Sequence, residues 1–161
     1  MAQQWGPYTA SNAQFGMASR LRVFRCRVGM HSLGRQGDSI SENHLTIYLL
    51  VGAGTCARLD MRPMDGNNTG ALVLSTHDYT LSQRIIRHED IPAAACPPAF
   101  DPDRSATVIA QGPTVGDFVR CITSRGLQYF RFVFVEGHSM GCHHWVLVVT
   151  MRDAETLLIA K

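Results

Sequence analysis

The sequence contains no long run of one chemical character. No apolar stretch reaches the roughly 18 residues that cross a bilayer, and the N-terminus lacks the apolar core of a signal peptide. The formal net charge is only +2 and there is no long basic segment, so nucleic acid is not an implied partner. These absences predict a globular protein with neither a membrane span nor a nucleic-acid surface.

Disulfide and zinc patterns are absent as well. The five cysteines are an odd number, are widely spaced and include no C-x-x-C pair. We therefore expect reduced thiols, a cytoplasmic location, and no metal or other cofactor. His143 and His144 follow Cys142 directly, but adjacent helix residues point in different directions, so one metal ion rarely takes both.

Length and composition favour a single domain. The 161 residues are 45% hydrophobic and 17% charged, which suits one chain with a sizeable core. Residues 1–19 are polar and small, and they predict a loosely attached N-terminal arm before a single domain over residues 20–161. No internal repeat or low-complexity segment interrupts that domain.

Strand patterns dominate the first half of the chain. The clearest strand covers residues 44–51, and glycines at positions 52 and 54 separate it from a second hairpin arm over residues 55–61. The other expected segments are strands at 21–28 and 71–75, a loop at 29–41, a strand or short helix at 81–88, and a proline-rich connector at 91–103.

Helix signals appear in the second half. Thr114, with Asp117 three residues later, is typical of a capping box and predicts a helix that ends near Arg125-Gly126. A strand-like run over residues 129–135 precedes a second expected helix over residues 142–152. Strands followed by helices predict an α+β fold, with a mainly antiparallel sheet and two or three helices packed against it.

The stretch 137–145, Gly-His-Ser-Met-Gly-Cys-His-His-Trp, carries two candidate nucleophiles. Ser139 lies in a G-x-S-x-G pattern, which is the nucleophile elbow of α/β-hydrolases. In that fold the acid and the histidine follow the serine, but here the only later histidines are His143 and His144, beside the motif itself. A serine hydrolase is therefore a lesser alternative.

Cys142 lies where the following helix is expected to begin. Unpaired N–H groups and the helix dipole stabilise a thiolate at such a position, and a nearby imidazole could take its proton. A free cysteine also packs well as a small apolar side chain. A reactive and a structural role for Cys142 both stay open.

Three phrases resemble the motifs of a known superfamily. His44 opens the phrase His-Leu-Thr-Ile-Tyr-Leu, Asp60 opens Asp-Met-Arg-Pro, and Cys142 opens Cys-His-His-Trp-Val. Together they resemble the lecithin retinol acyltransferase-like branch of the NlpC/P60 thiol superfamily, a circularly permuted papain-like fold. The chain is also similar to an uncharacterised fungal domain family with N-H-W, R-L-D-M and G-C-R-x-W motifs.

The resemblance covers about residues 43–152 and implies a role for each residue. Cys142 takes the place of the nucleophile, His44 that of the base, and Asp60 that of the residue that orients the imidazole. Leu45 stands where tryptophan is usual, and His143 stands where an acid or arginine is usual. We expect His44 and Asp60 on adjacent antiparallel strands and Cys142 at a helix N-terminus.

Four further residues are expected to contact a substrate. Tyr48 and Arg58 lie on the two arms of the predicted hairpin, while His143 and Trp145 follow the thiol. Trp145 is also expected to help fill the core. The histidines expected only to face solvent are His31, His77 and His88.

Two classes of function follow from these residues. The first is a small thiol enzyme that transfers or hydrolyses the acyl group of an amide, ester or thioester. The second is a non-covalent pocket protein, such as a ligand-binding module or a cyclase or isomerase of fungal small-molecule biosynthesis. Both imply a small-molecule partner, and both leave the oligomeric state open.

Overall fold

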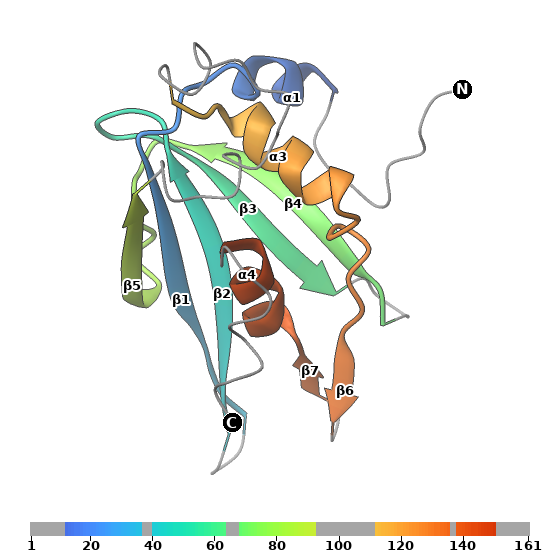
Figure 1. Cartoon of the computed structure of the whole chain (residues 1–161). Coiled ribbons are helices and arrows are strands. Elements are labelled where there is room, and N and C mark those ends of the chain that lie inside the picture. Colours follow the sequence, from blue (N-terminus) through green and yellow to red (C-terminus); the bar gives the residue numbers. More distant parts are fainter. Residues whose placement is uncertain (1–11, 37–39, 64–67, 93–111, 136–137, 151–161) are drawn as a thin grey trace.

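A computed structural model of the chain describes residues 12–36, 40–63, 68–92, 112–135 and 138–150 (Figure 1). Five strands form an antiparallel sheet in the order β4-β3-β2-β1-β5. They are β1 (Arg25–Gln36), β2 (Ile40–Leu50), β3 (Cys56–Pro63), β4 (Gly70–His77) and β5 (Ile85–Pro92). The hairpin over residues 44–61 is confirmed, since β2 and β3 pair as neighbours.

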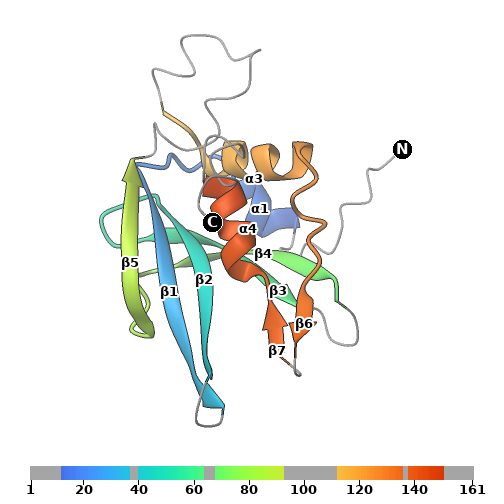
Figure 2. The same ribbon diagram turned by 60° about the horizontal axis from the view of Figure 1, so that its bottom comes forward.

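Short helices cover one face of this sheet (Figures 1 and 2). They are α1 (Asn12–Ala18), α3 (Val115–Ser124) and α4 (Cys142–Thr150), and a small hairpin of β6 (Val133–Val135) and β7 (His138–Met140) leads into α4. The predicted α+β class, with helices packed on an antiparallel sheet, is confirmed. None of the described helices is long and apolar enough to cross a membrane.

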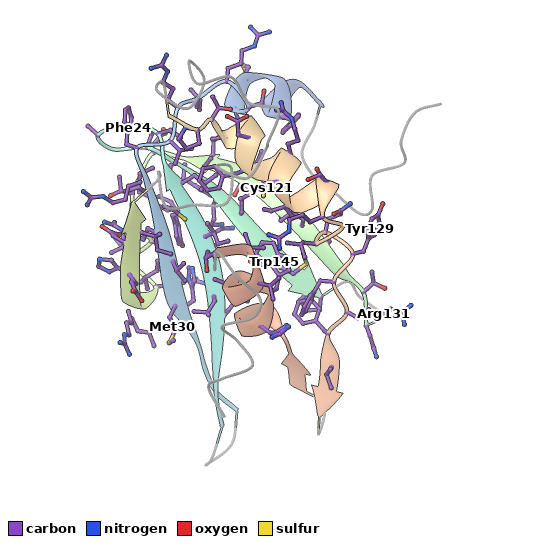
Figure 3. All side chains as sticks on the ribbon, in the orientation of Figure 1. Phe24, Met30, Cys121, Tyr129, Arg131 and Trp145 are labelled. Carbon is purple, nitrogen blue, oxygen red and sulfur yellow. The ribbon has the colours of Figure 1, made fainter. Side chains whose placement is uncertain are left out.

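The core lies between the sheet and the helices. On β3, Ala57, Leu59 and Met61 share this face and are completely buried. Trp145 of α4 belongs to the same core, and Figure 3 labels it beside the α4 ribbon. Residues of opposite parity on β2 and β3 face the other side of the sheet, because side chains alternate along a strand. That second face carries the charged residues of β3 and His44 of β2.

The strands β2 and β3 pair over only part of their length. Their ladder runs from Leu50 opposite Cys56 to Ile47 opposite Leu59, and no later pair follows. On the N-terminal side of Ile47, β2 stays paired with β1. On the C-terminal side of Leu59, β3 stays paired with β4 as far as Pro63. The two strands therefore separate, and Figure 1 shows α4 lying in front of the opening.

Residues 29–41 were expected to form a loop, and this prediction is wrong. Of the described residues in this range, 29–36 complete β1 and 40–41 begin β2, with a register irregularity between Ser32 and Arg35. Gly29 had suggested a loop, but it lies inside β1, and its lack of a side chain leaves room for the side chains of Ile85 and Tyr48. The ambiguous stretch 81–88 contains a turn and the first half of β5.

Part of the expected N-terminal arm belongs to the domain. Residues 12–18 form α1, and Ala18 is buried in the core. The carbonyl of Ser19 accepts a hydrogen bond of 2.9 Å from the backbone N–H of Gly116 in α3, which ties the segment down. Residues 1–11 of that arm lie outside the described residues, as do residues 93–103 of the expected connector.

The capping box at the start of α3 is confirmed. The Thr114 hydroxyl accepts a hydrogen bond from the Asp117 N–H at 3.3 Å, and the Asp117 carboxylate accepts one from the Thr114 N–H at 2.8 Å. Gly126, at φ +69°, follows the helix end as expected. A helix start specified by two residues three apart can thus be read locally.

We expect Thr114→Ala to lower the free energy of unfolding by about 1 kcal/mol, because the N–H group of Asp117 loses its acceptor. Thr114→Ser keeps the hydroxyl and is expected to stay near the wild type. Urea unfolding followed by circular dichroism measures both variants. Equal stability of Thr114→Ala and Thr114→Ser would contradict a role for the cap.

Candidate active site

His44 and Asp60 meet where β2 and β3 separate. Nε2 of His44 and Oδ1 of Asp60 share a hydrogen bond across the opening. The other carboxylate oxygen accepts a hydrogen bond of 2.6 Å from Nε of Arg62, and Nη2 of Arg58 lies 3.8 Å from it. The Asp60 side chain is only 3% exposed, so these cationic partners offset the cost of burying its charge.

Cys142 is the first residue of α4 and is half-buried. Its thiol hydrogen-bonds with the His44 side chain. The helix packs on the core side of the sheet, whereas His44 belongs to the alternate set of β2 residues, so the contact is made at the opening between the strands. His44 and Asp60 do lie on adjacent antiparallel strands, and Cys142 does begin a helix, as expected.

The turn before Cys142 requires glycine. Gly141 has φ +141°, and a Cβ there would approach Cε1 of Phe130 to 2.7 Å. The Gly141 carbonyl accepts a hydrogen bond of 2.9 Å from the Trp145 N–H, which closes the first helical turn. Nε1 of Trp145 donates to the Leu127 carbonyl at 2.9 Å. The backbone and a core side chain therefore hold Cys142 at the helix start.

The electrostatics of the pair favour charge on both partners. Burial lowers the pKa of His44, but hydrogen bonds to Asp60 and Cys142 raise it by more, from 6.5 to about 9. Burial likewise raises the pKa of Asp60, and the hydrogen bonds from His44 and Arg62 bring it below its ordinary 3.8. At neutral pH the ring is therefore an imidazolium that faces a carboxylate.

Two residues expected to contact a substrate are enclosed instead. Tyr48 is 0% exposed, and its hydroxyl shares a hydrogen bond of 2.8 Å with Nε2 of His31. Trp145 is 1% exposed and fills the core. Neither presents a surface to a substrate. Arg58 lines an open cleft beside Asp60. His143 lies in α4, but its side chain falls outside the described part of the chain.

His31 was expected to face solvent, and this prediction is wrong. It is 9% exposed, and its ring centroid lies 6.1 Å from the centroid of the Tyr48 ring and 6.2 Å from that of the His44 ring. The error follows from the loop prediction for residues 29–41, because a strand places His31 directly opposite His44. His77 is half-buried and stacks on Tyr79, whereas His88 is exposed as expected.

Ser139 does not lie at a turn between a strand and a helix. It is the middle residue of β7, opposite Phe134, and the turn into α4 is made by Gly141. The nucleophile elbow needs the serine at that turn. The thiol of Cys142, and not the serine, therefore occupies the strand-to-helix junction.

Within the described residues, no cluster of three or more histidine, cysteine, aspartate or glutamate side chains is arranged to hold a metal ion. Four cysteines in the described part of the chain form no disulfide; Cys26 and Cys56 are buried, and Cys121 and Cys142 are half-buried.

Comparison with known proteins gives one match. Residues 26–159 match the family described as Domain of unknown function (DUF7770). The matched segment includes His44, Asp60 and Cys142, and all of the five-stranded sheet except Arg25, the first residue of β1. No curated protein and no solved structure matches the chain.

The raised pKa of His44 predicts a pH-dependent stability. A histidine whose pKa is higher in the folded state stabilises the fold fully below pH 6.5, and this stabilisation is lost as pH rises through about 9. We therefore expect the free energy of unfolding to fall across this window. The fall should be smaller in His44→Asn, measured by urea unfolding at each pH. The exposed His88 supplies the control, and His88→Asn should behave as wild type; an equal fall in His44→Asn would contradict the assignment.

Proposed function

The chain belongs to the DUF7770 family, and we propose that it is a cysteine-dependent acyltransferase or hydrolase that acts on an amide, ester or thioester. The observation that carries this proposal is a connected set of three side chains. Cys142 at the N-terminus of α4 bonds to His44, and His44 bonds to the buried Asp60. A nucleophile, a base and a residue that orients the base are the elements of such catalysis.

The histidine supports the thiolate form of Cys142. A negative sulfur raises the pKa of His44, and by the same interaction the imidazolium favours the thiolate. The first turn of α4 adds to this effect, because its N–H groups lack intrahelical acceptors and carry partial positive charge. Since Nε2 of the ring is bonded to Asp60, Nδ1 is the nitrogen left to face the sulfur.

The proposed reaction proceeds in two steps. The Cys142 thiolate attacks the carbonyl carbon, a carbon–sulfur bond forms, and the carbonyl oxygen becomes an oxyanion that N–H groups at the start of α4 stabilise. The intermediate collapses to a thioester, and the imidazolium of His44 gives its proton to the leaving amine, alcohol or thiol. Water or a second nucleophile then loses a proton to His44 and attacks the thioester, which releases Cys142.

Asp60 acts on the ring and not on the substrate. Its carboxylate is held by Arg62 and bonded to Nε2, so it keeps the imidazole in one orientation and stabilises its charge. The resemblance to the lecithin retinol acyltransferase-like branch of the NlpC/P60 superfamily supports the same assignment. We propose that the substrate is a small molecule, that the protein acts in the cytoplasm, and that the reaction belongs to fungal small-molecule biosynthesis.

The alternative is a pocket protein that binds its ligand without covalent chemistry. One observation favours it, namely that the cleft beside His44 is lined by Asp60 and Arg58 but not by Cys142. In that case the thiol would be a structural residue that closes the opening between the strands. The reactivity of the thiol distinguishes the two functions.

We expect Cys142 to react with iodoacetamide near neutral pH roughly tenfold faster than Cys121, because a thiolate fraction of a few per cent rises several-fold for each unit of pKa depression. Cys121 is a matched control, since it is also half-buried and burial raises the pKa of its thiol. His44→Ala should slow the labelling of Cys142, and Asp60→Asn should slow it less. Mass spectrometry of labelled peptides gives the rates.

Labelling of Cys142 no faster than that of Cys121, in a chain shown to be folded by circular dichroism, would refute the thiol-enzyme proposal. If His44→Ala left the labelling rate of Cys142 unchanged, His44 could not be the base of the proposed mechanism. Either result would favour the pocket protein.

Ser139 is expected to be dispensable. Because it lies within β7 and away from the turn, Ser139→Ala should keep any hydrolysis of a p-nitrophenyl ester within about tenfold of wild type, a barrier change of about 1.4 kcal/mol. Cys142→Ala is expected to abolish that activity and is the matched control. Stoichiometric labelling of Ser139 by a fluorophosphonate would instead support the serine hydrolase.

A further inference from the structure

An open cleft of about 990 Å³ lies beside the His44–Asp60 pair. Its floor is made by the residues of β2 and β3 that alternate with the core residues, so it lies on the face of the sheet away from the helices. None of its described lining residues comes from a helix. The cleft is therefore a feature separate from the thiol.

The link between β4 and β5, residues 78–84, forms one wall. β4 and β5 are at opposite edges of the sheet, so this link has to cross the sheet between them. Nη1 of Arg27 donates to the Thr80 carbonyl at 3.3 Å, and Tyr79 stacks on His77 with ring centroids 4.7 Å apart. These contacts tie the link to the sheet, and Ser82 and Arg84 line the cleft beyond them.

The lining carries a marked excess of positive charge. It includes the arginines Arg58, Arg62 and Arg84, and Asp60 is the one acid among its described residues. Asp60 is already engaged by His44 and by Arg62. Its carboxylate therefore leaves much of the arginine charge uncompensated.

Arg58 has a hydrogen-bond donor without an acceptor, and Arg84 makes no ion pair within the described residues. Nε of Arg58 is buried and has no hydrogen-bond acceptor among the described residues, and the whole side chain is only 17% exposed. A buried donor without an acceptor costs free energy that a ligand oxygen would recover. For Arg84, no carboxylate of the described residues lies within ion-pair distance.

The positive charge around the cleft also lowers the pKa of His31, which is one of its lining residues. Burial lowers the pKa of His31, and the positive charges of His44, Arg58 and Arg84 lower it further. At neutral pH His31 is thus an uncharged ring among the residues that line the cleft. The three cationic side chains act on one small region, and a bound anion would be attracted by all of them.

We propose that this cleft binds a small organic molecule through an oxyanion group, a phosphate or a carboxylate, held by Arg58 and Arg84. Guanidinium groups suit both groups, because their paired N–H donors match two oxygens. The volume exceeds that of a single ion, and the exposed Ile86 and Pro63 in the lining offer apolar contact to the rest of the ligand. The proposal holds whether or not Cys142 is reactive.

The test is isothermal titration of the full chain with inorganic pyrophosphate and, separately, with succinate at low ionic strength. We expect at least one anion to bind with a Kd below about 10 mM, and Arg84→Gln and Arg58→Gln each to weaken it about tenfold. Tighter binding of pyrophosphate identifies a phosphate ligand, and tighter binding of succinate identifies a carboxylate. Uncharged succinamide should not bind.

Two variants serve as controls. Arg87 is exposed on β5 and does not line the cleft, so Arg87→Gln should bind as wild type does. Arg125, exposed just after α3, does not line the cleft either, so Arg125→Gln should stay within about threefold of the wild-type Kd. Arg84 lies in an exposed turn, so Arg84→Gln tests the proposal even where Arg58→Gln impairs folding.

The proposal is overturned when neither anion binds below that Kd, or when succinamide binds as well as succinate. It is also overturned when Arg84→Gln leaves the affinity of a bound anion unchanged, or when Arg87→Gln weakens it equally, because the effect would then be one of net charge alone.

Discussion

A buried carboxylate at the point where two strands separate is the constraint on which the site depends. Asp60 is almost fully enclosed, and an enclosed charge requires partners of opposite charge. His44 supplies one across the opening and Arg62 supplies another from the same strand. The ladder between β2 and β3 ends before this level, so side chains replace backbone hydrogen bonds there. The pair thus joins two strands that the backbone leaves apart.

The same opening connects the two faces of the sheet. On the helix side, α4 places Cys142 against His44, and on the other side His44 and Asp60 form part of the cationic cleft. A change in the cleft can therefore reach the thiol through the imidazole, because the hydrogen bonds of His44 set its pKa. His44 therefore contacts the proposed nucleophile and also lines the proposed anion site.

Sequence signals that act over a few residues predict the local structure correctly. The capping box of Thr114 and Asp117 specified the start of α3, and the alternation on β3 specified which face Leu59 takes. The junction at Gly141 specified where α4 begins, since a residue at positive φ interrupts the strand. Caps and alternation need only neighbours in sequence, so they are visible without a fold.

The sequence by itself therefore determined the α+β class, the hairpin of β2 and β3, and the helix start at Cys142. Only the tertiary structure decided that Tyr48 is buried against His31, and that Arg84 joins Arg58 around one cleft. These features depend on strand order and on where a ladder ends, and β1 meets β5 across some sixty residues of chain. Pairing over that distance is set by the packing of the whole sheet, which no local pattern of residues encodes.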